Sequence, residues 1–217
     1  MSNCCVTSKP EESAGKFFSR MSRRYAKRFR KGGLERSQQY LLEGIRKEPI
    51  AAKELLDIGC GVGSLHMTLL QEGARRAMGV DVSEGMIRQA EALAKELHLA
   101  EKTEYRLGDF VEQAGEIREA DVTMLDKVVC CYENHESLIA ASAAKTRSIY
   151  ALSYPNDNIL VEAVFRIQIF FAQLFRFAFH PFWHDWNEIH HSILAKGFQR
   201  IYSNSTFVWQ VSVYRRV

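Results

Sequence analysis

Short apolar runs alternate with amphipathic stretches from residue 54 to residue 153. The runs have the length and composition of buried strands, and the stretches between them repeat apolar side chains at helical spacing. The predicted strands are 54–58, 77–81, 103–107, 121–126 and 148–153, and the predicted helices are 64–72, 83–97, 111–117 and 135–145. This alternation predicts an α/β, doubly wound fold whose parallel sheet carries helices on both faces.

The N-terminal part of the chain departs from this alternation. Residues 16–45 have helical spacing, interrupted at Gly32 and Gly33, and predict a helical cap ahead of the first strand. Residues 1–15 are rich in Ser, Lys, Glu and Gly, so we expect a disordered tail there. Residues 16–217 are then expected to fold as a single domain, which is long enough to bury its own core.

The C-terminal part carries a predicted hairpin and an unusual insertion. Alternating residues at 199–204 and 207–215 predict the hairpin. Residues 156–184 are predicted to form a helical insertion after the fifth strand. They are apolar and aromatic, but Glu162 and Arg166 interrupt them and make a poor membrane span. The insertion is open to three interpretations: a helix packed into the core, a lid over a hydrophobic substrate pocket, or a membrane-surface contact. We prefer the lid, because the segment follows the carboxyl end of a strand, where ligands of open α/β sheets bind.

Charge and cysteine content set broader limits. The formal net charge of +3 indicates no strongly charged partner. Five cysteines form neither a disulfide framework nor a C-x-x-C metal pattern, which favours a reducing compartment. The polar N-terminus has no secretory signal, so we expect a cytoplasmic protein.

Positive charge is concentrated on the first predicted helix. Its basic residues, with no acidic residue between them, are Lys16, Arg20, Arg23, Arg24, Lys27, Arg28, Arg30 and Lys31. The preferred interpretation is a surface helix whose apolar stripe packs on the domain. An acidic substrate, a membrane surface or nucleic acid are the alternatives, and nucleic acid is not favoured.

The most informative segment is the run ELLDIGCGVG at 54–63. Its glycines, at 59, 61 and 63, lie between a predicted strand and a predicted helix, where positive φ and close ligand approach are needed. The spacing differs from the G-x-G-x-x-G of dinucleotide sites. Asp57, directly before the turn, would repel a phosphate but would suit an ammonium group. A tight turn without a ligand is the plain alternative.

Two acidic residues follow at later strand ends. Asp81 lies where a carboxylate binds ribose hydroxyls, although it could also cap the next helix. Asp109 stands beside Phe110, an apolar residue that could flank an adenine. No lysine or arginine lies in the glycine turn. The combination indicates a site for adenosine joined to an amino acid, that is, for S-adenosylmethionine.

Four motifs occur together in the chain: LLDIGCGVG (55–63), GVDVSEGMIRQA (79–90), GDF (108–110) and ADVTMLDKVV (120–129). With them the chain resembles the class I S-adenosylmethionine-dependent methyltransferases. The resemblance implies a Rossmann-like, mostly parallel seven-stranded sheet whose last strand is antiparallel. The helical cap, the insertion and Ser153-Tyr-Pro155 resemble, more loosely, magnesium-protoporphyrin O-methyltransferases.

The resemblance also implies the cofactor contacts. By this resemblance, the methionine end of the cofactor is bound by Asp57, Gly59, Cys60, Gly61 and Gly63, and its ribose by Asp81. The adenine is contacted by Val82, Met86, Asp109 and Phe110. Asp126 and Lys127 line the region of the reacting methyl group, and Tyr25 closes over the cofactor. For an acceptor base the candidates are His135, His180 and His184, with Tyr132 as an orienting hydroxyl. Each of these histidines could instead be structural.

We therefore expect methyl transfer to a small, apolar or aromatic acceptor, at oxygen. The segment after Asp126 lacks the Asp-Pro-Pro-aromatic motif of amino-methylating families, and no metal cluster is expected. Two alternatives stay open. One is a nucleic-acid methyltransferase that uses the basic helix, and the other is a non-catalytic S-adenosylmethionine-binding module. The oligomeric state is not predicted.

Overall fold

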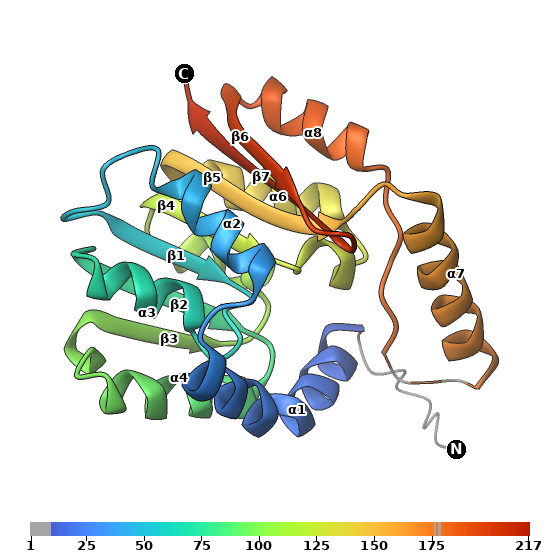
Figure 1. Ribbon diagram of the computed structural model, residues 1–217, viewed down its shortest axis with the longest axis horizontal. Helices are drawn as coiled ribbons and strands as arrows, with labels where there is room; N and C mark the ends of the chain where they lie inside the picture. The colour runs from blue at the N-terminus through green and yellow to red at the C-terminus, as the bar shows by residue number, and fades with distance from the viewer. Residues whose placement is uncertain (1–9, 176, 178) are drawn as a thin grey trace, which may run out of the picture.

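The computed structural model describes residues 10–175, 177 and 179–217, and it places a seven-stranded sheet between two layers of helices (Figure 1). The strands, in the order β3-β2-β1-β4-β5-β7-β6 across the sheet, are β1 Glu54–Ile58, β2 Arg76–Asp81, β3 Thr103–Leu107, β4 Ala120–Asp126, β5 Thr146–Pro155, β6 Phe198–Ser205 and β7 Trp209–Arg216. The helices are α1 Pro10–Gly32, α2 Arg36–Ile45, α3 Ser64–Gln71, α4 Glu84–Glu96, α5 Phe110–Gln113, α6 His135–Ala144, α7 Ile159–Leu174 and α8 Trp186–Ala195, with short 3₁₀ turns η1 Ala100–Lys102, η2 Ala114–Glu116 and η3 Val129–Cys131.

Strands β1 to β5 pair in parallel, and β7 pairs antiparallel with both β5 and β6. The predicted doubly wound class and the seven-stranded sheet are therefore confirmed. The C-terminal hairpin forms as β6 and β7. The predicted helix at 111–117 is shorter than expected, since α5 ends at Gln113 and η2 follows.

The two faces of the sheet carry separate hydrophobic cores, because successive strand residues point to opposite faces. Leu55 of β1 faces the core that includes Leu41 of α2 and Leu93 of α4. Leu56 faces the core that includes Leu138 of α6 and Ile189 of α8. The carboxyl ends of β1, β2 and β4 are thereby held at a common edge.

Helix α1 begins within the segment that we expected to be a disordered tail. It starts at Pro10, while residues 1–9, including Cys4 and Cys5, lie outside the described residues. Ala14 and Ser13 are buried, and Gly15 lies so close to the β2–α4 turn that an added Cβ would be 2.4 Å from the Val82 carbonyl oxygen. Tertiary packing thus orders a stretch whose composition alone suggests disorder.

Helix α7 stands apart from the two helical layers at one side of the molecule (Figure 1). Only Val161 and Ala172 are buried along it. Residues 179–185 are non-helical and lead to α8. None of the described helices is long and apolar enough to cross a membrane.

Candidate active site

A cavity of about 180 Å³ opens at the carboxyl ends of β1, β2 and β4. Twelve of the thirteen predicted cofactor-binding residues line it: Tyr25, Asp57, Gly59, Cys60, Gly61, Asp81, Val82, Met86, Asp109, Phe110, Asp126 and Lys127. Gly63 is the exception, since it lies at the start of α3 behind the turn. The fold therefore brings residues of the four sequence motifs together at one edge of the sheet, as is usual in parallel α/β sheets.

The glycine turn needs glycine for two different reasons. Gly59, Gly61 and Gly63 all have positive φ, of 63°, 54° and 82°. A Cβ on Gly59 would meet Val128 at 2.5 Å and one on Gly63 would meet the His66 ring at 2.8 Å, whereas one on Gly61 would have no atom within 4 Å. Gly61 thus presents bare backbone to open space in the cavity, where a ligand can approach it closely.

Asp81 ties this turn to the start of α4. One carboxylate oxygen accepts from the Gly61 amide at 2.8 Å, and the other accepts from the Ser83 amide at 2.8 Å. The helix cap itself is Ser83, whose hydroxyl accepts from the Met86 amide at 3.2 Å. Burial raises the pKa of Asp81 to about 6, although both amide hydrogen bonds oppose the shift.

Asp109 keeps one carboxylate oxygen without a partner. Its Oδ1 accepts from the Glu112 amide at 3.0 Å and begins α5. Its Oδ2 is buried and has no hydrogen-bond partner among the described residues. Buried polar atoms are rarely left unpaired, so the Oδ2 atom fits a donor supplied by a ligand. Phe110 is buried beside it and also lines the cavity.

Asp57 belongs to a buried relay that the sequence analysis missed. Its Oδ2 lies 2.8 Å from Nδ1 of His66, and His66 Nε2 lies 3.0 Å from the Tyr105 hydroxyl. Burial raises the pKa of Asp57, while the hydrogen bond from His66 opposes the shift. The only hint in the sequence was a histidine on the apolar face of the predicted helix.

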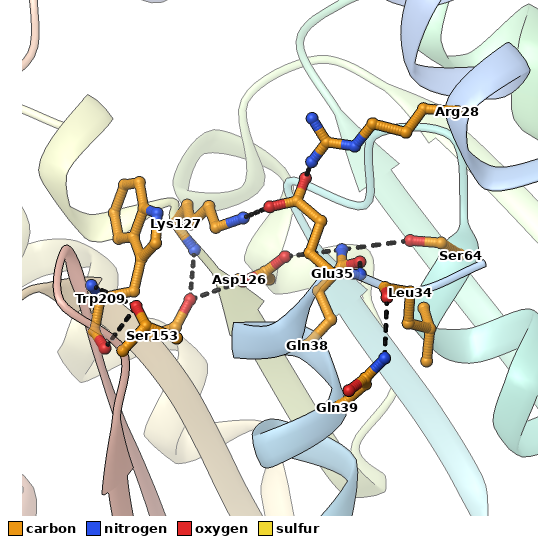
Figure 2. A network of polar contacts seen from close by, with 11 residues as sticks. Arg28, Leu34, Glu35, Gln38, Gln39, Ser64, Asp126, Lys127, Ser153 and Trp209 are labelled. Carbon is orange, nitrogen blue, oxygen red and sulfur yellow. Dashed lines mark hydrogen bonds and ion pairs between the residues drawn. The ribbon is translucent and has the colours of Figure 1, made fainter. Parts of the chain in front are cut away.

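A second polar network joins the helical cap to the end of β4 (Figure 2). Gln38 Nε2 donates to Asp126 Oδ2 at 2.9 Å and to Ser64 Oγ at 3.2 Å. Lys127 Nζ donates to Glu35 Oε2 at 2.7 Å, and Glu35 also pairs with Arg28 (Figure 2).

Ser153 holds the other end of this network. Its hydroxyl donates to Asp126 Oδ1 at 2.5 Å and accepts from the Lys127 amide at 3.0 Å. This fixes Lys127 at a φ of 61°, and its ammonium lies 5.2 Å from the centre of the Trp209 ring. Glu35, Gln38 and Ser64 line the cavity but were not predicted. Nothing local marks the start of α2, which supplies Glu35 and Gln38, as part of the site, and Ser64 begins α3 directly after the glycine turn.

Helix α1 covers the side of the cavity that the β2–α4 turn borders. Phe18 and Tyr25 line the cavity from this helix. Ser19 fixes it in place, since its hydroxyl lies 2.9 Å from that of Ser83 and accepts from the Gly85 amide at 3.1 Å. The cap is therefore attached to the same turn that holds Asp81.

The candidate acceptor-side residues separate into two groups. Tyr132 lines the cavity, but His135 and His180 do not. His135 begins α6 with its ring 4.3 Å from that of His184. His184 Nε2 lies 3.1 Å and 3.0 Å from the carbonyl oxygens of Val129 and Tyr132, so that nitrogen donates and anchors η3. Burial lowers the pKa of His184.

The second half of the insertion contacts segments that border the cavity. The Phe182 amide donates to the Cys130 carbonyl at 2.7 Å, and Phe179 lies 5.2 Å and 5.3 Å from the rings of Phe17 and Phe18. Within the described part of the insertion, no residue lines the cavity. Its expected role as a lid over the acceptor stays a prediction.

Known proteins match both the central segment and the whole fold. Residues 55–148 match the family described as "Methyltransferase domain". A ribosomal protein L11 methyltransferase of Alteromonas mediterranea is 32% identical over 132 residues, which are 61% of this chain and 41% of that protein. The chain spans less than half of the length of the curated relatives that it matches.

Solved structures extend the likeness to the two ends of the chain. A magnesium protoporphyrin IX methyltransferase from Synechocystis PCC 6803, solved with S-adenosylhomocysteine, superposes with a TM-score of 0.74 at 19% identity, over 94% of this chain and 98% of that one. A geranyl diphosphate methyltransferase superposes with a TM-score of 0.67 at 14% identity, over 83% and 77% of the two chains.

Proposed function

Since residues 55–148 match the family described as "Methyltransferase domain", we propose that this protein transfers the methyl group of S-adenosylmethionine to a small, largely apolar acceptor, at an oxygen atom. The methyltransferase assignment made from the motifs is confirmed by that match, as is the fold by the superpositions. The cofactor, the acceptor and the methylated atom are the proposed part.

One observation carries the choice of cofactor. Asp81, the open edge of Gly61 and the unpartnered Oδ2 atom of Asp109 all border the same cavity. A carboxylate at the end of β2 suits a ribose diol, and an unpaired buried acceptor suits an adenine amino group. The bare turn lets the remainder of the ligand lie against backbone amides.

At the other end of the cavity, charge and polarity fit an amino acid. Asp57 and Asp126 are carboxylates suited to an ammonium group, and Gln38 and Ser64 are neutral partners beside them. Lys127 is already paired with Glu35, so it does not present a free positive charge to a sulfonium. When bound, S-adenosylmethionine supplies the electrophilic methyl group, and the residues of this chain position the acceptor.

The acceptor side is bordered by apolar groups and one hydroxyl. Val128, Leu138 and Cys131 form an apolar wall, and Tyr132 adds a phenol. We propose that Tyr132 orients the acceptor oxygen by a hydrogen bond. His135 and His180 stay as candidate bases that would need to reach the acceptor through movement of the segment around them.

Cofactor binding and methyl transfer are separate tests of the proposal. Isothermal titration should show binding of S-adenosylmethionine by the full chain and its loss, by about 100-fold or more, in Asp81→Ala, because ribose hydroxyls would lose a buried charged partner. Tight binding by that variant would refute the assigned site. Methyl transfer is tested with labelled cofactor and a fractionated small-molecule extract, followed by mass identification of the product.

The two alternatives give different results in the same assay. A nucleic-acid methyltransferase would label RNA and would bind it with a steep dependence on salt. Several basic side chains of α1 are already used within the chain, since Arg28 pairs with Glu35 and Arg30 pairs with Glu96. A non-catalytic module would bind the cofactor and label nothing.

A further inference from the structure

Helix α7 has an apolar stripe that faces away from the rest of the chain. Spacings of four and three residues place five exposed side chains along one side of the helix: Leu160, Val164, Ile167, Phe171 and Leu174. The opposite side holds the buried Val161 and Ala172, together with Phe165, whose ring packs on Trp183 and Trp209. The stripe is therefore not the side that attaches α7 to the domain.

Exposed large hydrophobic side chains are concentrated on and just after this helix. Among the described residues, nine of the fifteen large hydrophobic side chains that are exposed fall between Ile159 and Phe177. Phe170 and Phe175 are 60% and 62% exposed on either flank of the stripe. The apolar arc is thus wider than the narrow seam of a coiled coil, and patches of this size mark a binding surface.

Helix α1, whose start contacts the segment that follows α7, carries a cationic side. Arg20, Arg23, Arg24 and Lys27 are exposed on α1 and form no ion pair within the described ranges of the chain. Phe17 lies on the same side of α1, is 42% exposed, and packs on Phe179 in the segment that leaves α7. The start of α1 is therefore in contact with the segment that follows α7.

We propose that α7 and the cationic side of α1 together dock this protein on an anionic lipid surface. An apolar helix face beside clustered arginine and lysine side chains is the combination that binds in the interfacial plane of anionic membranes. Glu162 and Arg166 pair with each other at 2.7 Å, so the charges of α7 do not oppose insertion of the stripe. The helix lies on the surface and does not cross it. The proposal does not depend on which acceptor is methylated.

Vesicle sedimentation of the full chain tests it. The chain should pellet with phosphatidylcholine vesicles that contain phosphatidylglycerol, and raising the salt concentration should release it. Ile167→Gln with Leu174→Gln should lower partitioning by more than about tenfold, because two exposed apolar side chains no longer enter the lipid. Arg23→Glu with Arg24→Glu should lower it by at least about 20-fold, since each basic side chain contributes roughly a fivefold factor.

Matched variants on other surfaces separate docking from general effects. Leu107→Gln with Leu194→Gln removes two exposed apolar side chains elsewhere, and Lys47→Glu with Lys102→Glu reverses two exposed charges elsewhere. Both should sediment as the unchanged protein does. Failure of the unchanged chain to pellet at low salt would overturn the proposal. So would a result in which the α7 variant turns a dimer into a monomer but still binds vesicles, since a second copy would then be what covers the stripe.

Discussion

Gln38 Nε2 lies 2.9 Å from Asp126 Oδ2, which joins the first turn of α2 to the end of β4 across 88 residues of sequence. Both residues line the cavity. The helical cap is thereby attached directly to the part of the site where we place the methionine end and the reacting methyl. The contact makes the cap part of the binding site as well as a cover for it.

This contact predicts that Gln38→Ala weakens binding of S-adenosylmethionine by roughly tenfold, the usual effect of losing a hydrogen bond to a charged group. The melting temperature should fall by a few degrees as well, because Gln38 Oε1 accepts from the Glu35 amide and closes the capping box of α2. Titration calorimetry measures the first effect and thermal unfolding the second.

Gln39→Ala is the matched control. The Gln39 side chain donates to the Leu34 carbonyl at 3.1 Å and points away from Asp126 (Figure 2). The affinity of the Gln39→Ala variant for the cofactor should equal that of the unchanged protein. An equal loss in both variants would mean that α2 acts through its stability and not through this hydrogen bond.

The pKa of Asp81 predicts how cofactor binding depends on pH. Burial raises this pKa to about 6 in the free protein, so the carboxyl becomes protonated as pH falls through 6. Ribose hydroxyls are bound better by the ionised form. The affinity should therefore be nearly constant above pH 7 and roughly tenfold lower at pH 5. Asp81→Asn should bind weakly with a flat profile between these values, and an equally steep profile in that variant would assign the dependence to another group.

The same shift has a consequence for the stability of the free protein. A carboxyl whose pKa is higher in the folded than in the unfolded state favours folding when it is protonated. The contribution of Asp81 to the free energy of unfolding should therefore decline as pH rises from about 4 to about 6. Lowering the pH should therefore stabilise the free protein through Asp81 but weaken cofactor binding, because the cofactor binds the ionised carboxylate.

The buried pair of Asp57 and His66 predicts a large effect on stability. His66→Phe leaves a buried carboxylate without its partner, which should lower the free energy of unfolding by about 3–5 kcal/mol at neutral pH. Because burial raises the pKa of Asp57, protonation relieves the cost, and the loss should be smaller at pH 5 than at pH 8. Urea denaturation at the two values measures both.

The double variant Asp57→Asn with His66→Phe identifies the cause. Removing the charge as well should restore part of the lost stability. If the double variant is less stable than His66→Phe alone, the defect is one of packing around the phenyl ring and the buried charge is not responsible.

How far the sequence predicts this site depends on where each residue lies in the chain. Asp81 and Asp109 follow predicted strands, and parallel strand ends meet at one edge of a sheet, so their convergence could be inferred. Glu35 and Gln38 belong to the start of α2, whose place over the sheet is set by tertiary packing, and no local pattern reports that. His66 had the spacing of an ordinary helix residue, and only the fold reveals that it faces Asp57.

The ends of the chain show the same limit. Polar composition suggested disorder up to residue 15, but close packing of Gly15 on the Val82 carbonyl orders that stretch into α1. The apolar insertion was correctly expected to contain a helix, yet composition could not say which of its sides would meet the domain. That outcome depends on Trp183, at the end of the insertion, and on Trp209, which comes from β7.

Glycine-to-alanine variants distinguish the cost of backbone strain from the cost of filling the cavity that would hold the cofactor. Gly33, Gly61 and Gly63 have similar positive φ values of 65°, 54° and 82°, so alanine at any of them costs about 1 kcal/mol of conformational strain. An added Cβ meets no atom within 4 Å at Gly33 or Gly61, but it lies 2.8 Å from the His66 ring at Gly63. Gly33→Ala should therefore lower stability through the strain alone.

Gly61→Ala should show a similar change in melting temperature together with a loss of cofactor affinity of at least about tenfold, because its methyl group occupies the cavity. Gly63→Ala should be the least stable of the three, since the imidazole that partners Asp57 must shift. Calorimetry and thermal unfolding on all three variants measure these effects, and equal cofactor affinity in Gly33→Ala and Gly61→Ala would place the ligand away from the turn.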